Sequence, residues 1–266
     1  MVSIIDVNDV KFQWKTVWYV FFWSNQVWPS GILPWIYHNP TSWLISMSYD
    51  AITWVTIADK NLWATTVYNN WDTLSESNCG KFYQWWNNYW FPFTWAVNIS
   101  TVEVDATGYW PWNYYSDSTF ICDTYTWDWT SPSVDNLWWW DTGTLAAMQW
   151  PCPSGFHIPS VTEWNNLLSV GSAIWRWALA YSFPKPWYLG SQWTHWWEDS
   201  WMLYWTAEYT WSWNNNAVAF NWVNVNSFNQ YKTYWYSIRP FKNTAVAPDI
   251  SWEIIYRPLS YNYYNQ

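Results

Sequence analysis

The sequence predicts an α+β chain that combines short strands, one well-defined helix and long polar loops. Residues 218–225 and 234–239 alternate apolar and polar side chains, which is typical of strands. Residues 159–170 instead repeat their apolar side chains at helical spacing, and residues 98–145 are polar with no helical period. The high aromatic and β-branched content disfavours disorder. Mixed secondary structure is therefore expected along most of the chain.

The elements follow one another in an order that suggests three parts. Residues 1–50 mix short apolar runs with turn residues and are expected to form an accessory segment, β-rich or irregular. Residues 51–243 hold the main domain, beginning with a strand at 53–57 and continuing through the polar region 98–145, where short strands are expected near residues 99–102. Residues 244–266 turn polar and proline-punctuated, as a linker or tail would.

The predicted helix at 159–170 has a recognisable beginning. Ser160 is a suitable N-cap, and Glu163 stands three residues later, which completes a capping box. Trp164 and Leu167 then fall on one face of the helix, so we expect this face to pack into the core. Glu163 is accordingly interpreted as a structural cap in preference to an acid or base.

Composition and charge exclude several kinds of partner. The chain has 10 Lys and Arg residues against 19 Asp and Glu residues, and no basic cluster, so nucleic acid is not expected to bind. The apolar run at residues 17–23 is too short to span a membrane, and no transmembrane segment is predicted. Neutral hydrogen bonding and stacking suit a chain in which only 11% of residues are charged.

No catalytic site, metal site or cofactor is predicted. The sequence contains no phosphate-binding loop and no nucleophile motif. His195 and Glu198 lack a second histidine nearby, whereas zinc sites need three or four ligands. The acidic residues of the 117–141 region could offer oxygen ligands to Ca²⁺, but their spacing fits no EF-hand, and a solvated loop is the preferred interpretation. His157 is expected to be a structural hydrogen-bonding residue.

Tryptophan and glycine are present in unusual numbers. The chain contains 35 Trp and only 7 Gly, whereas average usage would give about 19 Gly for this length. Several of the tryptophans stand where a turn calls for a small residue that tolerates positive φ. These positions are Trp71, Trp110, Trp112, Trp138, Trp139, Trp140 and Trp150. Read as glycine, each would give ordinary turn chemistry.

We therefore hypothesise an alternative genetic code in the source organism, in which UGA specifies glycine and was translated as tryptophan. Some uncultured bacterial lineages are recoded in this way. Genuine UGG-encoded tryptophans would remain among the 35. The other interpretation is a truly tryptophan-rich carbohydrate binder, and UGG codons at Trp71, Trp110 and Trp139 would favour it.

Four blocks between about Ile52 and Lys242 carry a family resemblance. The most specific is 152–160, Cys-Pro-Ser-Gly-Phe-His-Ile-Pro-Ser, closed by Glu163 and Trp164. The others are 55–65, 80–86, and the pair 204–209 and 234–240. Taken in their order along the chain, the four blocks resemble the Fibrobacter succinogenes major paralogous domain (FISUMP), a β-rich bacterial surface module. The match improves when Trp63, Trp86 and Trp235 are read as glycine.

The resemblance implies a C-type-lectin-like mixed fold, similar to that of formylglycine-generating proteins, with a small twisted antiparallel sheet, one or two helices and long ordered loops. It implies structural roles for Cys152, Gly155, His157, Pro159, Glu163, Trp164 and Arg239. The family's cysteine in the third block often has a partner just after the closing arginine, where this chain has Pro240. A Cys122–Cys152 disulfide would be the substitute, with Cys79 left over.

Two functions remain open. The first is a non-enzymatic recognition or adhesion module, secreted or on the bacterial cell surface, that binds an unknown protein or glycan. Its ligand face is expected in the C-terminal loops rich in Asn, Tyr and Ser, because such chemistry is adaptable. The candidate residues are Trp205, Tyr209, Asn214, Asn215, Asn224, Asn226 and Tyr231. The alternative is a structural spacer of a larger envelope protein.

Overall fold

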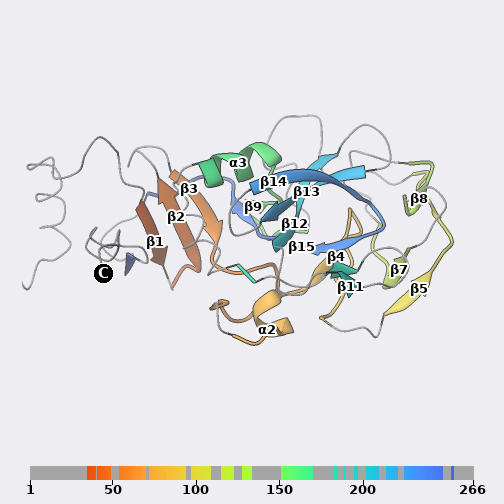
Figure 1. Ribbon diagram of the computed structural model, residues 1–266, viewed down its shortest axis with the longest axis horizontal. Helices are drawn as coiled ribbons and strands as arrows, with labels where there is room; N and C mark the ends of the chain where they lie inside the picture. Colours follow the sequence, from red (N-terminus) through yellow and green to blue (C-terminus); the bar gives the residue numbers. More distant parts are fainter. Residues whose placement is uncertain are drawn as a thin grey trace, which may run out of the picture.

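The structure is a computed structural model that describes fifteen stretches of the chain. They are residues 35–39, 41–48, 54–69, 72–93, 97–108, 115–122, 128–133, 151–169, 183–184, 188–189, 195–196, 202–209, 214–220, 225–247 and 253–254. These residues form small antiparallel and mixed sheets together with two helices (Figure 1). The predicted combination of strands with one or two helices is confirmed at this level.

The first sheet is antiparallel throughout and has six strands in the order β17-β1-β2-β3-β16-β9. Their bounds are β1 (Trp35–Asn39), β2 (Leu44–Ser48), β3 (Trp54–Ala58), β9 (Phe156–His157), β16 (Phe241–Lys242) and β17 (Glu253–Ile254). Strand β17 near the end of the chain pairs with β1, so this sheet joins residues on both sides of the predicted boundaries near 50 and 243. The three-part division therefore stays a prediction.

The second sheet is mixed and has seven strands. Its path runs β11-β10-β15-β12-β13-β14, and β4 also pairs with β15. The bounds are β4 (Phe82–Gln84), β10 (Tyr188–Leu189), β11 (His195–Trp196), β12 (Met202–Tyr209), β13 (Asn214–Phe220), β14 (Val225–Tyr231) and β15 (Trp235–Ser237). Only the β12–β15 pair is parallel. The expectation of a single antiparallel sheet was therefore too simple.

The polar region 98–145 is partly strand. Strand β5 (Asn98–Ser100) pairs in parallel with β7 (Thr119–Ile121), and β6 (Val104–Asp105) with β8 (Thr130–Ser131). These pairs lie at the right-hand end of the molecule in Figure 1, whereas β1 and β17 lie at the left-hand end. The strand expected near residues 99–102 is present as β5, and the other three were not predicted because two or three residues carry too little periodicity.

Both helices begin with a capping box. Helix α2 (Glu76–Cys79) follows Ser75, whose backbone N–H donates to Oδ1 of Asn78. Helix α3 (Val161–Ser169) is the one predicted at residues 159–170, and Ser160 and Glu163 exchange the expected bonds. Ser160 N donates to Oε2 of Glu163 at 2.9 Å, and Glu163 N donates to Oγ of Ser160 at 3.0 Å. The prediction is confirmed, with the boundaries shifted by one or two residues.

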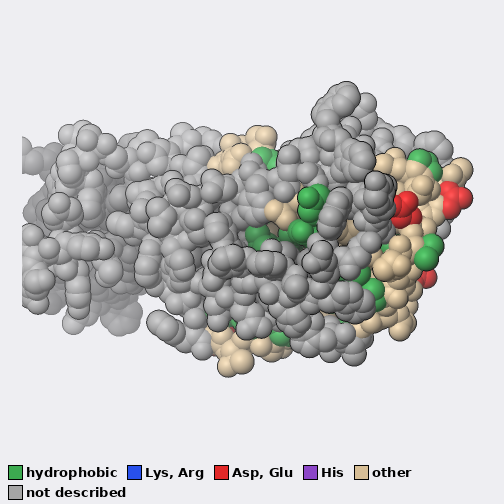
Figure 2. Space-filling view, turned by 45° about the vertical axis from the view of Figure 1, so that its right-hand side comes forward, with side chains coloured by type: hydrophobic (Ala, Val, Ile, Leu, Met, Phe, Trp, Pro, Cys, Tyr) green, Lys and Arg blue, Asp and Glu red, His purple; other side chains and the backbone are tan. Residues whose placement is uncertain are grey.

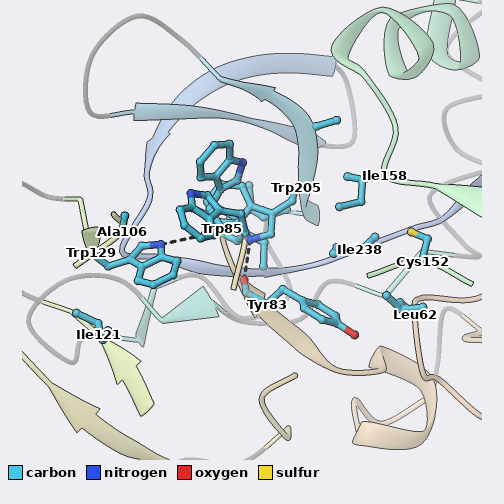
Figure 3. Close-up of a cluster of buried hydrophobic side chains, with 14 residues drawn as sticks. Leu62, Tyr83, Trp85, Ala106, Ile121, Trp129, Cys152, Ile158, Trp205 and Ile238 are labelled. Carbon is cyan, nitrogen blue, oxygen red and sulfur yellow. Dashed lines mark hydrogen bonds between the residues drawn. The ribbon is translucent and has the colours of Figure 1, made fainter. Parts of the chain in front are cut away.

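The core is aromatic and lies between the mixed sheet and the polar region. Its main cluster contains Trp85, Trp129 and Trp205 together with aliphatic side chains from several elements (Figure 3). A second cluster surrounds Trp235, whose ring stacks on Phe82 with centroids 5.3 Å apart. On the other side of β12, Trp164 of α3 packs against Tyr204 and Phe241. The predicted packing of Trp164 into the core is confirmed.

One predicted strand was wrong. Residues 218–225 were expected to form a single strand, but β13 ends at Phe220 and β14 begins at Val225, where the two pair as an antiparallel hairpin. Phe220 lies opposite Val225, so the alternating pattern continued across a chain reversal. Alternation alone cannot reveal a turn inside a β-rich stretch. Of the strand predicted at 234–239, residues 235–237 form β15, while Ile238 and Arg239 lie outside a strand, and β16 begins only at Phe241.

Candidate functional site

The described residues of the predicted ligand face, 205–209, 214–220 and 225–231, lie in strands and not in loops. Strands β12, β13 and β14 form an antiparallel meander, and seven residue pairs join β13 to β14. The loop prediction relied on the adaptable chemistry of the many Asn, Tyr and Ser residues and on the resemblance to lectin-like folds. Neither feature excludes strands, whose formation depends on the neighbours with which they pair. The prediction of loops was therefore wrong for the described residues of this site.

Trp205 is a core residue and not part of a ligand face. Its side chain is fully buried, and its indole Nε1 donates to the carbonyl oxygen of Tyr83 at 2.6 Å. Its ring meets Tyr236 edge to face with centroids 4.5 Å apart. Figure 3 shows the indole inside the main cluster, next to Trp85. A side chain in this position cannot contact a ligand at the surface, so its assignment is corrected.

The other predicted ligand residues fall in three kinds of place. Tyr209 lies opposite Asn215 at the end of the β12–β13 pair. Asn214 lies opposite Tyr231 in the β13–β14 pair, and Asn226 also lies in β14. Asn224 falls outside the described residues. Tyr231, the last residue of β14, has a half-buried side chain and is therefore partly accessible at the surface.

Tyr231 begins a tight turn that leads from β14 into β15. Tyr234 N donates to the carbonyl oxygen of Tyr231 at 3.0 Å, which closes a four-residue turn. The two tyrosine rings meet edge to face with centroids 5.4 Å apart, and both are half-buried. Lys232 and Thr233 between them are buried. We call residues 231–234 the tyrosine turn.

The tyrosine turn is anchored by a buried ion pair, which we call the lysine bridge (Asp128, Ser133 and Lys232). Lys232 Nζ donates to Oδ2 of Asp128 at 2.9 Å and to Oγ of Ser133 at 3.0 Å. Ser133 in turn donates to Oδ2 of Asp128 at 2.6 Å. The other carboxylate oxygen of Asp128 accepts from the backbone and hydroxyl of Thr130. Asp128 therefore receives four hydrogen bonds, which offsets the cost of burying its charge.

The lysine bridge joins two segments that are far apart in the sequence. Lys232 belongs to the tyrosine turn, and Asp128 and Ser133 flank β8 at the right-hand end of Figure 1. Residues 131–133 are exposed, and the hydroxyl of Ser133 contacts Lys232 of the tyrosine turn at 3.0 Å. Gln230 completes the group, because its Oε1 accepts from the hydroxyl of Tyr236 at 2.9 Å. The arrangement offers aromatic faces, hydroxyls and an amide, all suited to neutral polar ligands.

The contact between Ser133 and Lys232 does not amount to an activated nucleophile. A serine needs a neighbouring base that can take its proton. Asp128 accepts hydrogen bonds from both residues, so the lysine is engaged with a carboxylate instead of being available as a base. Within the described stretches, no group of three or more His, Cys, Asp and Glu side chains could hold a metal ion.

The residues of the family-like block around 152–164 form a second network, which we call the helix-cap network (His157, Ser160, Glu163 and Asn243). His157 is fully buried, with Nε2 2.8 Å from Oε1 of Glu163 and Nδ1 2.9 Å from Oδ1 of Asn243. Burial would raise the pKa of Glu163, but the bonds from His157 and Ser160 outweigh it and hold this pKa below its ordinary value. The network fixes α3 to β9 and to the end of β16.

The remaining residues of that block have packing roles. Gly155 adopts a φ of 82°, and the carbonyl oxygen of Pro159 accepts from Ala207 N of β12. Cys152 lies in the main core cluster and Cys122 in the second cluster. No disulfide joins them, so the predicted Cys122–Cys152 bridge was wrong for this structure. Burial raises the pKa of the Cys152 thiol.

Arg239 connects the closing strand to β3. Its guanidinium is fully buried, donates from Nη1 to the carbonyl oxygen of Ala58 at 3.2 Å and lies 4.1 Å from the centroid of Phe183. Burial lowers the pKa of Arg239, and the neighbouring Tyr204 and Asp59 oppose this shift. Burial also raises the pKa of Tyr204 to about 12. These buried contacts give Arg239 a structural place between the two sheets.

Comparison with known proteins adds no relative. No family model, curated protein or solved structure matches the chain. No helix among the described residues is long and apolar enough to cross a membrane. Sequence reasoning named Tyr231 as a candidate but not Tyr234 or the lysine bridge, which the structure places in or against the same turn. The Tyr231–Tyr234 spacing could have indicated a turn, whereas nothing in the sequence connects Lys232 with Asp128.

Proposed function

We propose that this protein is a non-enzymatic recognition or adhesion module, secreted or displayed at the bacterial cell surface, whose ligand face is the tyrosine turn with the adjoining residues 131–133. The observation that carries the proposal is the pair of half-buried rings of Tyr231 and Tyr234, held on a buried ion pair. Rigid tyrosines give contact area at a low cost in conformational entropy. The exposed residues 131–133, joined to the turn by the contact between Ser133 and Lys232, add hydroxyl groups for directional hydrogen bonds.

The charges near this face favour a neutral or cationic ligand. Asp105 is exposed and lies opposite Ser131. Asp105 lies in β6, which pairs with β8, and Figure 2 shows acidic side chains gathered at that end of the molecule. The neighbouring Lys232 is buried and paired with Asp128, so its charge does not balance them. A neutral glycan or an uncharged or basic peptide fits this surface better than a phosphorylated or sulfated ligand.

The placement of the outer strands favours recognition over the spacer alternative. Strand β17 pairs with β1, so the described strands nearest to either end of the chain lie side by side. They lie at the end of the molecule opposite to β8 (Figure 1). A module attached at one end displays the other end, whereas a spacer gains length when its two connections lie at opposite ends. The C-type-lectin-like fold is part of this proposal, supported by α3 after Pro159 and by the pairing of β16 with β3.

The proposal is tested by measuring glycan-array and cell binding for the unaltered protein and for Tyr231→Ala. We expect Tyr231→Ala to weaken binding by about tenfold or more, because central aromatic residues dominate recognition surfaces. Tyr89→Ala is the matched control, since Tyr89 is also half-buried but packs on Trp90 and Phe91 in the second cluster. Equal loss in both variants, or no loss in Tyr231→Ala, would contradict the proposed face.

A further inference from the structure

Positive φ angles occur at only two residue types in the described part of the chain. Three of them belong to glycines, Gly80, Gly108 and Gly155. The other three belong to tryptophans, Trp43, Trp63 and Trp86, with φ of 60°, 66° and 49°. Left-handed backbone is costly for a residue with a Cβ atom, and among such residues Asn and Asp adopt it most readily. Bulky tryptophan is a poor choice for all three positions.

Two of these tryptophans occupy the glycine position of a tight turn. Ala64 N donates to the carbonyl oxygen of Asn61 at 3.0 Å, which makes Trp63 the third residue of a four-residue turn. Asn87 N donates to Gln84 in the same way, and Trp86 is the third residue of that turn. A positive φ at the third residue defines a turn type that normally requires glycine or asparagine there. Trp43 stands just before Leu44, at the end of the β1–β2 connection, where hairpins also favour glycine.

Exposure separates Trp43 and Trp63 from the tryptophans of the core. Trp86 is buried in the main cluster, with its ring centroid 4.9 Å from that of Trp129, so only its positive φ distinguishes it. The side chains of Trp43 and Trp63 are 53% and 60% exposed. Trp129, Trp164 and Trp205 do not adopt positive φ and are fully buried, and Trp129 and Trp205 donate their indole N–H to backbone carbonyls. Trp235, for which the family resemblance implies glycine, belongs with this second group, because it is buried at the centre of its cluster.

We propose that residues 43, 63 and 86 are glycine in the protein as its own cells make it, each specified by a UGA codon, and that Trp129, Trp164 and Trp205 are genuine. This inference does not rest on the proposed ligand face. It adds residue 43 to the positions that sequence context identifies, and it rests on backbone geometry instead of composition. It also removes Trp43 and Trp63, the two most exposed indoles among the described residues, as candidates for a stacking platform.

The first test separates the effect of the backbone conformation on stability from the effect of removing the indole side chain. In the tryptophan-containing chain, residues 43 and 63 are each changed to Gly and to Ala, and urea unfolding is measured. Both changes remove the indole, but only glycine removes the Cβ atom that opposes positive φ. We expect the folding equilibrium constant to be about five- to thirtyfold higher for Trp43→Gly and Trp63→Gly than for the matching Ala variants.

Trp90 provides the control, because it is 41% exposed and its φ is not positive. There we expect Trp90→Gly to be no more stable than Trp90→Ala. Equal stability of the Gly and Ala variants at residues 43 and 63, or Gly variants less stable than the tryptophan chain, would overturn the inference.

The second test reads the residues directly, from the codons and from peptide masses of protein isolated from its natural source. UGG codons at 43, 63 and 86 would also overturn the inference. This second test includes residue 86, where the buried ring of Trp86 makes a stability measurement hard to interpret.

Discussion

The helix-cap network and the lysine bridge are alike in the groups they pair but differ in how far apart the paired residues lie in the sequence. Each holds a buried basic side chain, His157 or Lys232, against a carboxylate. Glu163 is six residues from His157, whereas Asp128 is 104 residues from Lys232. The contact between His157 and Glu163 forms within one strand-to-helix connection, although Asn243 joins the network from 86 residues away, whereas the ion pair of the lysine bridge requires two distant parts of the chain to meet. The comparison indicates that the cap organises local structure and the bridge fixes the arrangement of segments around the proposed ligand face.

The largest expected effect is that of Lys232→Met on the lysine bridge. Methionine keeps most of the length of the side chain but leaves the buried carboxylate of Asp128 without its cation. We expect the free energy of unfolding to fall by about 3–5 kcal/mol, as is usual when one member of a buried pair is removed. Urea unfolding measures it. The double variant Lys232→Met with Asp128→Leu should recover most of the loss, and a single variant within about 1 kcal/mol of the unaltered protein would contradict the importance of the bridge.

A smaller effect is expected from Glu163→Ala in the helix-cap network. The variant loses the bond from Ser160 N and the contact with His157, for a loss of about 1–2 kcal/mol in the free energy of unfolding. Glu163→Gln is the control, because its amide oxygen can still accept from Ser160 N. We expect Glu163→Gln to retain about half of the stability that Glu163→Ala loses. If the two variants were equally destabilised, the capping bond would contribute little.

The pH dependence of stability should distinguish the charge of Glu163 from its capping bond. The pKa of Glu163 is lowered in the folded protein, so its carboxylate contributes stability above the unfolded value, about 4.3, and loses it as the pH falls through the folded value. We expect the unaltered protein to be more stable than Glu163→Gln by about 1 kcal/mol at pH 7, with the difference vanishing in acid. Urea unfolding at several pH values measures it, and a difference that grows in acid would reverse the assigned sign.

The same contrast explains which features could be predicted from the sequence. The capping box, helix α3 and the packing of Trp164 depend on spacings of three to four residues, which the sequence displays directly. The lysine bridge has no such signal, since Lys232 and Asp128 meet only after the sheets have assembled. Trp205 was assigned to a ligand face for a related reason. An aromatic residue in a strand has no local feature that tells a core position from an exposed one.

The meander of β12, β13 and β14 is the opposite case, because a local sequence signal was present but predicted the wrong structure. Its many Asn and Ser residues indicate a loop, yet the seven paired positions of β13 and β14 form a regular hairpin. Strand formation depends on neighbours that the sequence does not identify. The tyrosine turn was only half predicted, as Tyr231 without Tyr234, because a turn is defined by the hydrogen bond that closes it.

The smallest effect is expected from Ser133→Ala, at the exposed edge of the lysine bridge. Its hydroxyl lies 2.6 Å from Oδ2 of Asp128 and 3.0 Å from Nζ of Lys232, while the residue itself is exposed. Water can take the place of the hydroxyl, and the ion pair between Lys232 and Asp128 remains, so the free energy of unfolding should fall by only about 0.5 kcal/mol. Urea unfolding measures this against Lys232→Met. A loss as large as that of Lys232→Met would mean that the hydroxyl, and not the ion pair, holds the two segments together.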